Sequence, residues 1–339
     1  MFRHGAHPTN DGHVGNGRIM SKQGRGRGAS GGTGKRPGRP GGSAGAGAGG
    51  GRPGQRSGAR PGQRSGPPPR RTGGPQGGGR EADPRTSGRG LGGKQIEGRQ
   101  AVRELLMAEK RKIYDIFISA DLEGDAGVAD IVEIARAQRV MVTYIARAKL
   151  DRDARSESPQ GVLATAAELE EADLGGLLRT KNGVKPFLVA VDGVTDPGNL
   201  GAIIRNCDGA GVTGVLLPKH RAVHVTPTVA KASAGAIEHV PIALIPGLPA
   251  TLANMKDHGI WIVGLDDSAD RDLFELAALA NEPICLVLGA EGGGLSKLVR
   301  QRCDTIVSIP MMGRISSLNV SAAAALSTYE ITRGRRAAS

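Results

Sequence analysis

FLVAVDGVTDPGNLGAIIRNCDGAGVTGVLLP, residues 187–218, reads as a strand, a turn, a helix and a second strand. Phe187 to Asp192 is apolar up to its last residue, Gly198 to Gly209 has helical spacing, and Gly214 to Pro218 is apolar again. The same alternation predicts further strands at 240–245, 261–265, 284–289 and 306–309, and further helices at 226–236, 248–258 and 318–333. Apolar strands separated by such helices predict an α/β domain with a mostly parallel sheet covered on both faces.

A second, smaller α/β unit precedes this domain. Apolar residues recur at helical spacing over 96–106 and 128–138, and two short segments, 113–118 and 140–145, have the pattern of strands. We assign residues 94–166 to this unit and residues 185–339 to the larger domain. The segment between them, residues 167–184, is rich in Glu and then in Gly and Lys, which predicts a linker.

Residues 1–93 differ from the rest in composition. Residues 1–94 carry 18 Lys or Arg and three Asp or Glu, a net charge of +15, whereas the whole chain carries +12. The segment is dense in Gly, Pro, Ser and Arg, and it repeats Arg-Pro-Gly-Gln-Arg-Ser-Gly at 52–58 and 60–66. Too few apolar residues are present to offset the entropy of ordering, which predicts a disordered basic tail. Such an arm can bind phosphate backbones without reading sequence, or it can be a solubilising extension only.

The cellular compartment is predicted from apolar runs and cysteines. No apolar run near residue 1 resembles a signal peptide, and none approaches the roughly 20 residues that span a bilayer. The three cysteines, Cys207, Cys285 and Cys303, are odd in number and widely spaced, which favours reduced thiols over disulfides. We therefore expect a cytoplasmic protein without a membrane partner.

Residues suited to chemistry gather after the predicted strands. The helix that follows the strand at 187–192 presents Asn199 and Arg205 at the carboxyl edge of the sheet, where open α/β sheets bind ligands. A glycine loop, Gly289 to Gly294, follows another strand and contains one charged side chain, Glu291. Its backbone N–H groups allow close approach of a ligand, and the lone carboxylate suits an uncharged or cationic molecule such as S-adenosylmethionine better than a phosphate.

The third segment, Ser316-Ser317-Leu318-Asn319-Val320-Ser321, leads into an alanine-rich helix. Each of these segments also has a purely structural interpretation, as a helix cap, a surface arginine or a turn. Two other patterns are misleading. Gly209 to Gly214 matches G-x-G-x-x-G, but a helix precedes it and a strand follows, which is the reverse of a nicotinamide site. His220 and His224 lack a third ligand nearby, so we expect no metal site.

Taken together, residues 199–205, 288–296 and 316–321 resemble, in order, the three motifs of the SpoU (TrmH) family of RNA ribose methyltransferases, in the SPOUT superfamily. Gly98-Arg99-Gln100-Ala101-Val102 is similar to the start of the RNA-recognition domain found in its two-domain members. The resemblance implies a C-terminal trefoil knot that holds S-adenosylmethionine, and a homodimer. It also implies methylation of a ribose 2′-hydroxyl, mostly in large-subunit (23S) ribosomal RNA. The alternatives are a transfer RNA substrate, or a non-catalytic RNA-binding or ribosome-assembly factor.

The resemblance also implies roles for individual residues. Gly289, Ile309 and Leu318 would contact the cofactor mainly through their backbone atoms. Met311 and Ser317 would lie close to the cofactor. Those that match the polar positions of the family's active site are Asn199, Arg205, Glu291 and Asn319. Because arginine holds its proton up to about pH 12, we expect Arg205 to bind phosphate and stabilise a developing alkoxide rather than act as the base. No metal is expected, because the leaving group is a neutral thioether. One departure, Pro159-Gln160-Gly161 in place of the usual His-Gln-Gly, leaves the RNA target open.

Overall fold

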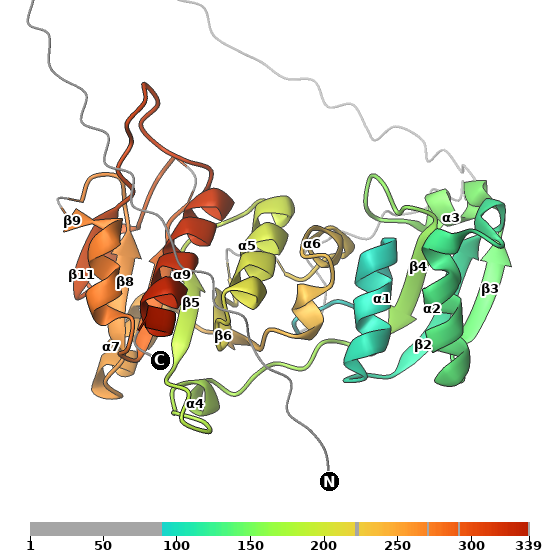
Figure 1. The fold of residues 1–339 in the computed structure, drawn as a ribbon, viewed down its shortest axis with the longest axis horizontal. Coiled ribbons are helices and arrows are strands. Elements are labelled where there is room, and N and C mark those ends of the chain that lie inside the picture. Colours follow the sequence, from blue (N-terminus) through green and yellow to red (C-terminus); the bar gives the residue numbers. More distant parts are fainter. Residues whose placement is uncertain (1–89, 221–223, 270, 291, 338–339) are drawn as a thin grey trace, which may run out of the picture. The chain divides into compact units, whose positions relative to one another are not determined.

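The computed structural model describes residues 90–220, 224–269, 271–290 and 292–337, so the predicted basic tail lies outside the described residues. Two sheets organise these residues (Figure 1). The smaller has four strands in the order β1-β4-β2-β3, and the larger has seven in the order β7-β6-β5-β10-β8-β11-β9. No helix among the described residues has the length and apolar character needed to cross a membrane.

The smaller sheet lies within residues 94–166, the segment expected to form the smaller α/β unit. Its strands and helices are β1 (Gln95–Glu97), α1 (Arg99–Ala108), β2 (Ile113–Ser119), η2 (Ala120–Leu122), α2 (Ala126–Ala137), β3 (Met141–Ile145), α3 (Arg147–Asp153) and β4 (Val162–Ala166). The β2 and β3 strands are parallel, while β4 runs antiparallel to both β1 and β2. Ile116, Ile118 and Ala164 are fully buried in its core. Two features fix the turn at Pro159-Gln160-Gly161 to the smaller α/β unit. Pro159 is buried, and Gln160 Oε1 accepts the backbone N–H of Arg99 at 3.1 Å.

The helix predicted from residue 96 is wrong at its start. Residues 95–97 are extended and pair with β4, and Gly98, at φ 97°, separates them from α1. Glu97 is fully buried, and its carboxylate accepts the backbone N–H groups of Arg155 at 2.7 Å and Ser156 at 3.0 Å. The partners that hold this strand lie almost 60 residues downstream, beyond the reach of a local periodicity.

All strand pairs of the larger sheet are parallel, which confirms the predicted sheet type. Its strands are β5 (Phe187–Val191), β6 (Gly214–Pro218), β7 (Ile242–Ile245), β8 (Trp261–Leu265), β9 (Arg271–Asp272), β10 (Ile284–Leu288) and β11 (Thr305–Ser308). The segments that connect or follow them contain α5 (Pro197–Gly209), α6 (Pro227–Ala232), η3 (Ala236–Glu238), α7 (Leu248–Asp257), η4 (Leu273–Leu279), α8 (Lys297–Arg300) and α9 (Val320–Ala337).

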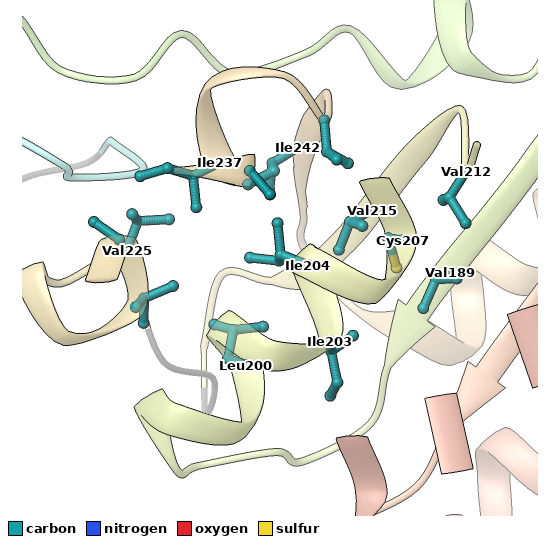
Figure 2. Close-up of a cluster of buried hydrophobic side chains, with 14 of the residues drawn as sticks. Val189, Leu200, Ile203, Ile204, Cys207, Val212, Val215, Val225, Ile237 and Ile242 are labelled. Atoms are coloured by element: carbon teal, nitrogen blue, oxygen red, sulfur yellow. The ribbon is translucent and has the colours of Figure 1, made fainter. Parts of the chain in front are cut away.

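Each face of this sheet has its own buried cluster, because successive residues of a strand point to opposite faces. On one face, Leu200, Ile203, Ile204 and Cys207 of α5 pack toward Val189 and Val215, as Figure 2 shows. The same cluster contains Val320, Ala324 and Ile331 of α9, which lies beside α5 (Figure 1). The opposite face is covered by α7, through Leu248, Leu252 and Met255. Helices therefore cover both faces, as predicted.

Two further boundaries differ from the prediction. The helix expected at 226–236 ends at Ala232, because Ala234 and Gly235 adopt left-handed backbone angles before η3 begins. The segment 167–184, expected to be a plain linker, contains a short helix, α4 (Leu174–Leu177), whose Leu177 is buried in the α7 cluster. Apolar burial of two leucines, Leu177 and Leu178, accounts for this ordering of a Gly-rich stretch.

A buried ion pair joins Arg111, just before β2, to Glu238 of η3. The Arg111 guanidinium donates to Glu238 at 2.9 and 2.5 Å, and also to the carbonyl oxygens of Gly93 and Ala167. The two charged side chains are only 5% and 1% exposed. The charges compensate each other out of water, so removing either one leaves the other buried without a partner.

We expect Arg111→Met to lower the free energy of unfolding by about 3–5 kcal/mol, because Glu238 would then stay buried as an unpaired charge. Denaturant unfolding followed by circular dichroism measures the change. Arg103→Met is the matched control, since Arg103 pairs with Asp130 at 2.7 Å on an exposed surface and its loss should change stability little. Equal stability losses in the two variants would contradict the special role of the buried pair.

Candidate active site

Three neighbouring strands end together at one edge of the larger sheet. The last residue of β10, Leu288, pairs in register with Val191 of β5 on one side and Leu265 of β8 on the other. The residues that follow these strands, Asp192, Gly289 and Asp266, therefore leave the sheet at the same edge. This is the carboxyl end of a parallel sheet, where ligands of open α/β folds bind.

A pocket of about 610 Å³ opens at this edge. Its walls combine the ends of β8 and β10, the glycine loop, Arg300 of α8, and the segment that leads from β11 into α9. The apolar lining residues include Leu265, Leu288, Val307, Ile309 and Leu318. This volume lies in the usual range of small-molecule and cofactor sites.

The glycine loop after β10 folds back on itself. Ala290 and Gly294 exchange two backbone hydrogen bonds of 3.0 Å each, which closes a narrow hairpin. A Cβ atom on Gly289 would lie 2.3 Å from the carbonyl carbon of Gly294, so only glycine fits at this position. Gly292 and Gly294 have φ angles of 69° and 59°, in the left-handed region. The backbone of the loop, rather than its side chains, therefore forms this wall of the pocket.

The opposite wall comes from the segment before α9. Ile309, Met311 and Ser316 to Asn319 line the pocket. Asn319 caps α9, because its Oδ1 accepts the backbone N–H of Ser321 at 2.8 Å and the Ser321 hydroxyl at 2.6 Å. Its Nδ2 donates to Asn199 Oδ1 at 3.0 Å.

Asn199 is held at the start of α5. Asp196 is the N-cap of this helix and accepts the Asn199 N–H at 2.7 Å, with Pro197 at the first helical position. A second bridge, from Asn206 Nδ2 to the carbonyl of Ser321 at 2.8 Å, ties the two helices together. Two residues 120 positions apart in the chain, Asn199 and Asn319, thus meet beside the pocket.

The structure brings most, but not all, of the predicted site residues together. Those that line the pocket are Gly289, Ile309, Met311, Ser317, Leu318 and Asn319. Asn199 contacts one of them, and Glu291 lies outside the described residues. Arg205 is exposed and does not line the pocket. It follows Asn199 by six residues, which at about 100° per residue places it on another side of α5.

Four polar residues at this edge were not predicted: Asp192, Asp266, Ser268 and Arg300. Asp266 accepts the N–H and hydroxyl of Ser268 at 3.1 and 2.5 Å, and pairs with Arg300 at 2.8 Å. Partial burial would raise the pKa of Asp266, but the hydrogen bonds from Ser268 and Arg300 outweigh it and hold this pKa at about 2. The signal in the sequence is a carboxylate directly after an apolar strand, the same signal that marks Asp192.

The pocket suits a ligand with an apolar part and a positive charge. Among its described lining residues, Asp266 and Asp267 carry negative charge and Arg300 carries positive charge. Exposed backbone N–H and C=O groups of the glycine loop offer hydrogen bonds without further charge. The residues present therefore fit S-adenosylmethionine, which has an adenine, a ribose and a sulfonium.

The G-x-G-x-x-G match is a connection between a helix and a strand. It connects the end of α5 at Gly209 to the start of β6 at Gly214, so the helix precedes the strand, as predicted. Across the described ranges, no group of three or more His, Cys, Asp or Glu residues is arranged to hold a metal ion.

Comparison with known proteins agrees with this geometry. The SpoU rRNA Methylase family matches residues 186–329, and the RNA 2'-O ribose methyltransferase substrate binding family matches residues 95–172. The chain is 41% identical over 243 residues to YacO of Bacillus subtilis, whose name places it in the TrmH family of tRNA/rRNA methyltransferases; the match covers 71% of this chain and 95% of YacO. It is 40% identical over 244 residues to the 23S rRNA (guanosine-2'-O-)-methyltransferase RlmB of Shewanella oneidensis, covering 71% of this chain and 97% of that protein.

A solved structure is similar over both sheets. The SpoU methyltransferase AviRb from Streptomyces viridochromogenes, in complex with the cofactor AdoMet, superposes with a TM-score of 0.60 at 26% identity. The match covers 72% of this chain and 90% of AviRb.

Proposed function

Because the chain belongs to the SpoU (TrmH) family of S-adenosylmethionine-dependent RNA methyltransferases, we propose that it methylates a ribose 2′-hydroxyl in large-subunit (23S) ribosomal RNA. The observation that carries the proposal is the pocket in which the glycine loop faces the 309–319 segment, beside the Asn199–Asn319 pair. Support for the RNA target comes from RlmB of Shewanella oneidensis, 40% identical and named for a guanosine 2'-O position in 23S rRNA. We also propose that the protein acts in the cytoplasm.

The parts of the chain that contain the two sheets would have different functions. We assign RNA binding to residues 94–166 and methyl transfer to residues 185–339. The backbone of Gly289, Ile309 and Leu318 would hold the cofactor, with Met311 and Ser317 close by. The two pocket walls formed by the glycine loop and the 309–319 segment correspond to the part of the chain in which the family's trefoil knot is expected, and we propose that the chain is knotted there.

The polar residues would act on the ribose. Bound S-adenosylmethionine supplies an electrophilic methyl group and leaves as a neutral thioether. As the 2′ oxygen forms its bond to that methyl, its proton passes to water or to a carboxylate, for which Glu291 is the candidate. Arg205 would bind the adjoining phosphate and stabilise the developing alkoxide. Asn199 and Asn319 would orient the ribose.

Arg205 lies outside the pocket of its own subunit, so we propose that the active site is completed in a homodimer, with Arg205 of the partner subunit facing the pocket. Support comes from the exposed face of α9, where Leu326 is 47% and Tyr329 is 51% exposed. Apolar side chains exposed in this way are typical of protein interfaces. The described residues include no metal cluster, and the proposed chemistry requires none.

The decisive experiment compares ribose methylation across total cellular RNA with and without the protein. Loss of one 2′-O-methyl group in 23S rRNA when the protein is absent supports the proposal. Loss of such a group in transfer RNA would instead make transfer RNA the substrate. No change in any RNA, with calorimetry showing NADH binding and no binding of S-adenosylmethionine, would overturn the proposed function.

The oxygen and the nitrogen of the Asn319 amide have different roles that substitution can separate: Oδ1 caps α9, and Nδ2 donates to Asn199. We expect Asn319→Ala to reduce methylation by about 10²-fold, the scale seen when one oriented polar group of an active site is lost. Asn319→Asp keeps an oxygen to cap α9 but removes the Nδ2 donor to Asn199, so its stability should stay near wild type while its activity falls. Thermal unfolding and a methyl-transfer assay measure the two effects. Full activity in Asn319→Asp would reduce Asn319 to a helix cap.

The basic tail should contribute to RNA affinity. Deleting residues 1–89 removes 17 Lys or Arg and three Asp or Glu, so we expect weaker RNA binding, most clearly at low salt, with intact folding and cofactor binding. Filter binding over a range of salt concentrations measures the RNA affinity and its dependence on salt. The matched control keeps the tail length and replaces its arginines with glutamine. An unchanged affinity and salt slope after deletion would leave the tail as a passive extension.

A further inference from the structure

Two aspartates, one from each strand beside β10, flank the glycine loop. Asp192 follows β5 and Asp266 follows β8, and these strands pair with β10 on its two sides. The loop that leaves β10 therefore emerges between two carboxylates. Both carboxylates accept backbone N–H groups at the point where the loop ends.

Asp192 holds one of these amides. Its Oδ2 accepts the N–H of Ser296 at 2.8 Å, and its own backbone N–H donates to the carbonyl of Leu288 at 2.8 Å. A single residue of the β5 strand end thus contacts the last residue of β10 and the residue that follows the loop. The entry and the exit of the loop are tied to the same point.

Asp266 holds the preceding amide from the other side. Its Oδ2 accepts the N–H of Leu295 at 3.4 Å, a long contact, while Oδ1 receives Arg300 and Ser268. The Asp266 side chain is 8% exposed, and its backbone N–H donates to Val307 of β11 at 3.1 Å. Arg300 belongs to α8, which begins directly after the loop, so the network also fixes the direction in which the chain leaves.

The two contacts together hold the end of the loop at its base. They act on consecutive amides, and the loop above them is a hairpin without room for a Cβ at Gly289. Charged acceptors make the stronger class of hydrogen bond to backbone N–H groups. A loop held in this way can present its backbone to a ligand without being ordered by it, which avoids part of the entropic cost of binding.

We infer that Asp192 and Asp266 are positioning residues for the cofactor loop: they set the affinity for S-adenosylmethionine by holding the amides of Ser296 and Leu295, and they take no part in methyl transfer. The inference rests on the proposed function for the identity of the ligand. It predicts that the loop has its binding geometry before the cofactor arrives.

Alanine at either position should weaken S-adenosylmethionine binding by about tenfold, the effect of one charge-assisted hydrogen bond. Asparagine, which keeps an oxygen acceptor, should restore part of the affinity. Asp257→Ala is the control, because Asp257 is an exposed aspartate at the end of α7 and does not line the pocket. Calorimetry measures the affinity for S-adenosylmethionine. Amide hydrogen exchange measures the protection of the backbone N–H groups of Leu295 and Ser296.

Exchange in the wild-type protein gives a readout that does not depend on whether the variants fold. In wild-type protein without cofactor, the amides of Leu295 and Ser296 should already be protected, and protection should fall at Leu295 in Asp266→Asn and at Ser296 in Asp192→Asn. Rapid exchange at both amides in the wild-type protein would overturn the inference. So would affinities within twofold of wild type in both alanine variants, provided that the wild type binds S-adenosylmethionine. Failure of the wild type to bind it at all would instead overturn the proposed function.

Discussion

Replacing Arg205 with alanine should lower the rate of RNA methylation by about 10²-fold or more, with affinity for S-adenosylmethionine near that of the wild type. Arg205 is exposed on α5 and does not line the pocket, so its loss leaves the proposed cofactor walls intact. Arg205→Lys should recover only part of the rate, because a point charge cannot make the two parallel hydrogen bonds of a guanidinium to phosphate and alkoxide. Single-turnover methyl transfer and calorimetry measure the two quantities.

A mixture of two inactive variants tests whether Arg205 acts across subunits. In dimers that combine Arg205→Ala with Asn319→Ala, one of the two sites would contain both intact residues if they come from different subunits. Random pairing of equal amounts would then restore about a quarter of the wild-type activity. No recovery in verified mixed dimers would place both residues in the same subunit, and normal turnover in Arg205→Ala alone would remove Arg205 from the mechanism.

Gly289→Ala should abolish most cofactor binding, with an affinity loss of about 10²-fold or more. The new Cβ would lie 2.3 Å from the carbonyl carbon and 2.5 Å from the carbonyl oxygen of Gly294, and 2.7 Å from the nitrogen of Leu295. All three are backbone atoms, so the hairpin itself must move. Calorimetric titration with S-adenosylmethionine measures the loss.

The control for this change is Gly247→Ala, at the start of α7 and outside the pocket. A Cβ there meets no described atom within 4 Å, and its backbone does not lie in the left-handed region, so binding should stay near wild type. Equal affinity in the two variants would show that the hairpin adapts freely and that its shape does not control the site.

The larger domain was largely predictable because its strands are continuous apolar runs. The strands β5, β6, β8 and β10 coincide with such runs, and the directions of these strands follow from the helices between them. The β1 strand was not predictable from periodicity, because Gln95 to Glu97 are held by β4 and by a buried contact to Ser156. Local patterns contain no information about such distant partners.

The candidate site shows the same division. Gly289 and Leu318, which the resemblance implies as cofactor contacts, both line the pocket, and their role in cofactor binding stays a prediction. Arg205 lies elsewhere because six helical residues turn it away from Asn199, a consequence that the helical repeat alone predicts. Asp192 and Asp266 required the strand order, since only the pairing of β5 and β8 with β10 brings both carboxylates to one loop.

The buried thiols give the molecule two internal reporters of opening. Cys207 lies between α5 and the sheet (Figure 2), and Cys285 lies within β10; burial raises the pKa of both thiols well above the usual range. Neither can react with a thiol reagent while its surroundings are closed. Cys303 is partly exposed, and burial raises its pKa to about 11, so it provides the reference rate. The modification rate of Cys207 would therefore report local detachment of α5, and that of Cys285 would report unfolding of the sheet.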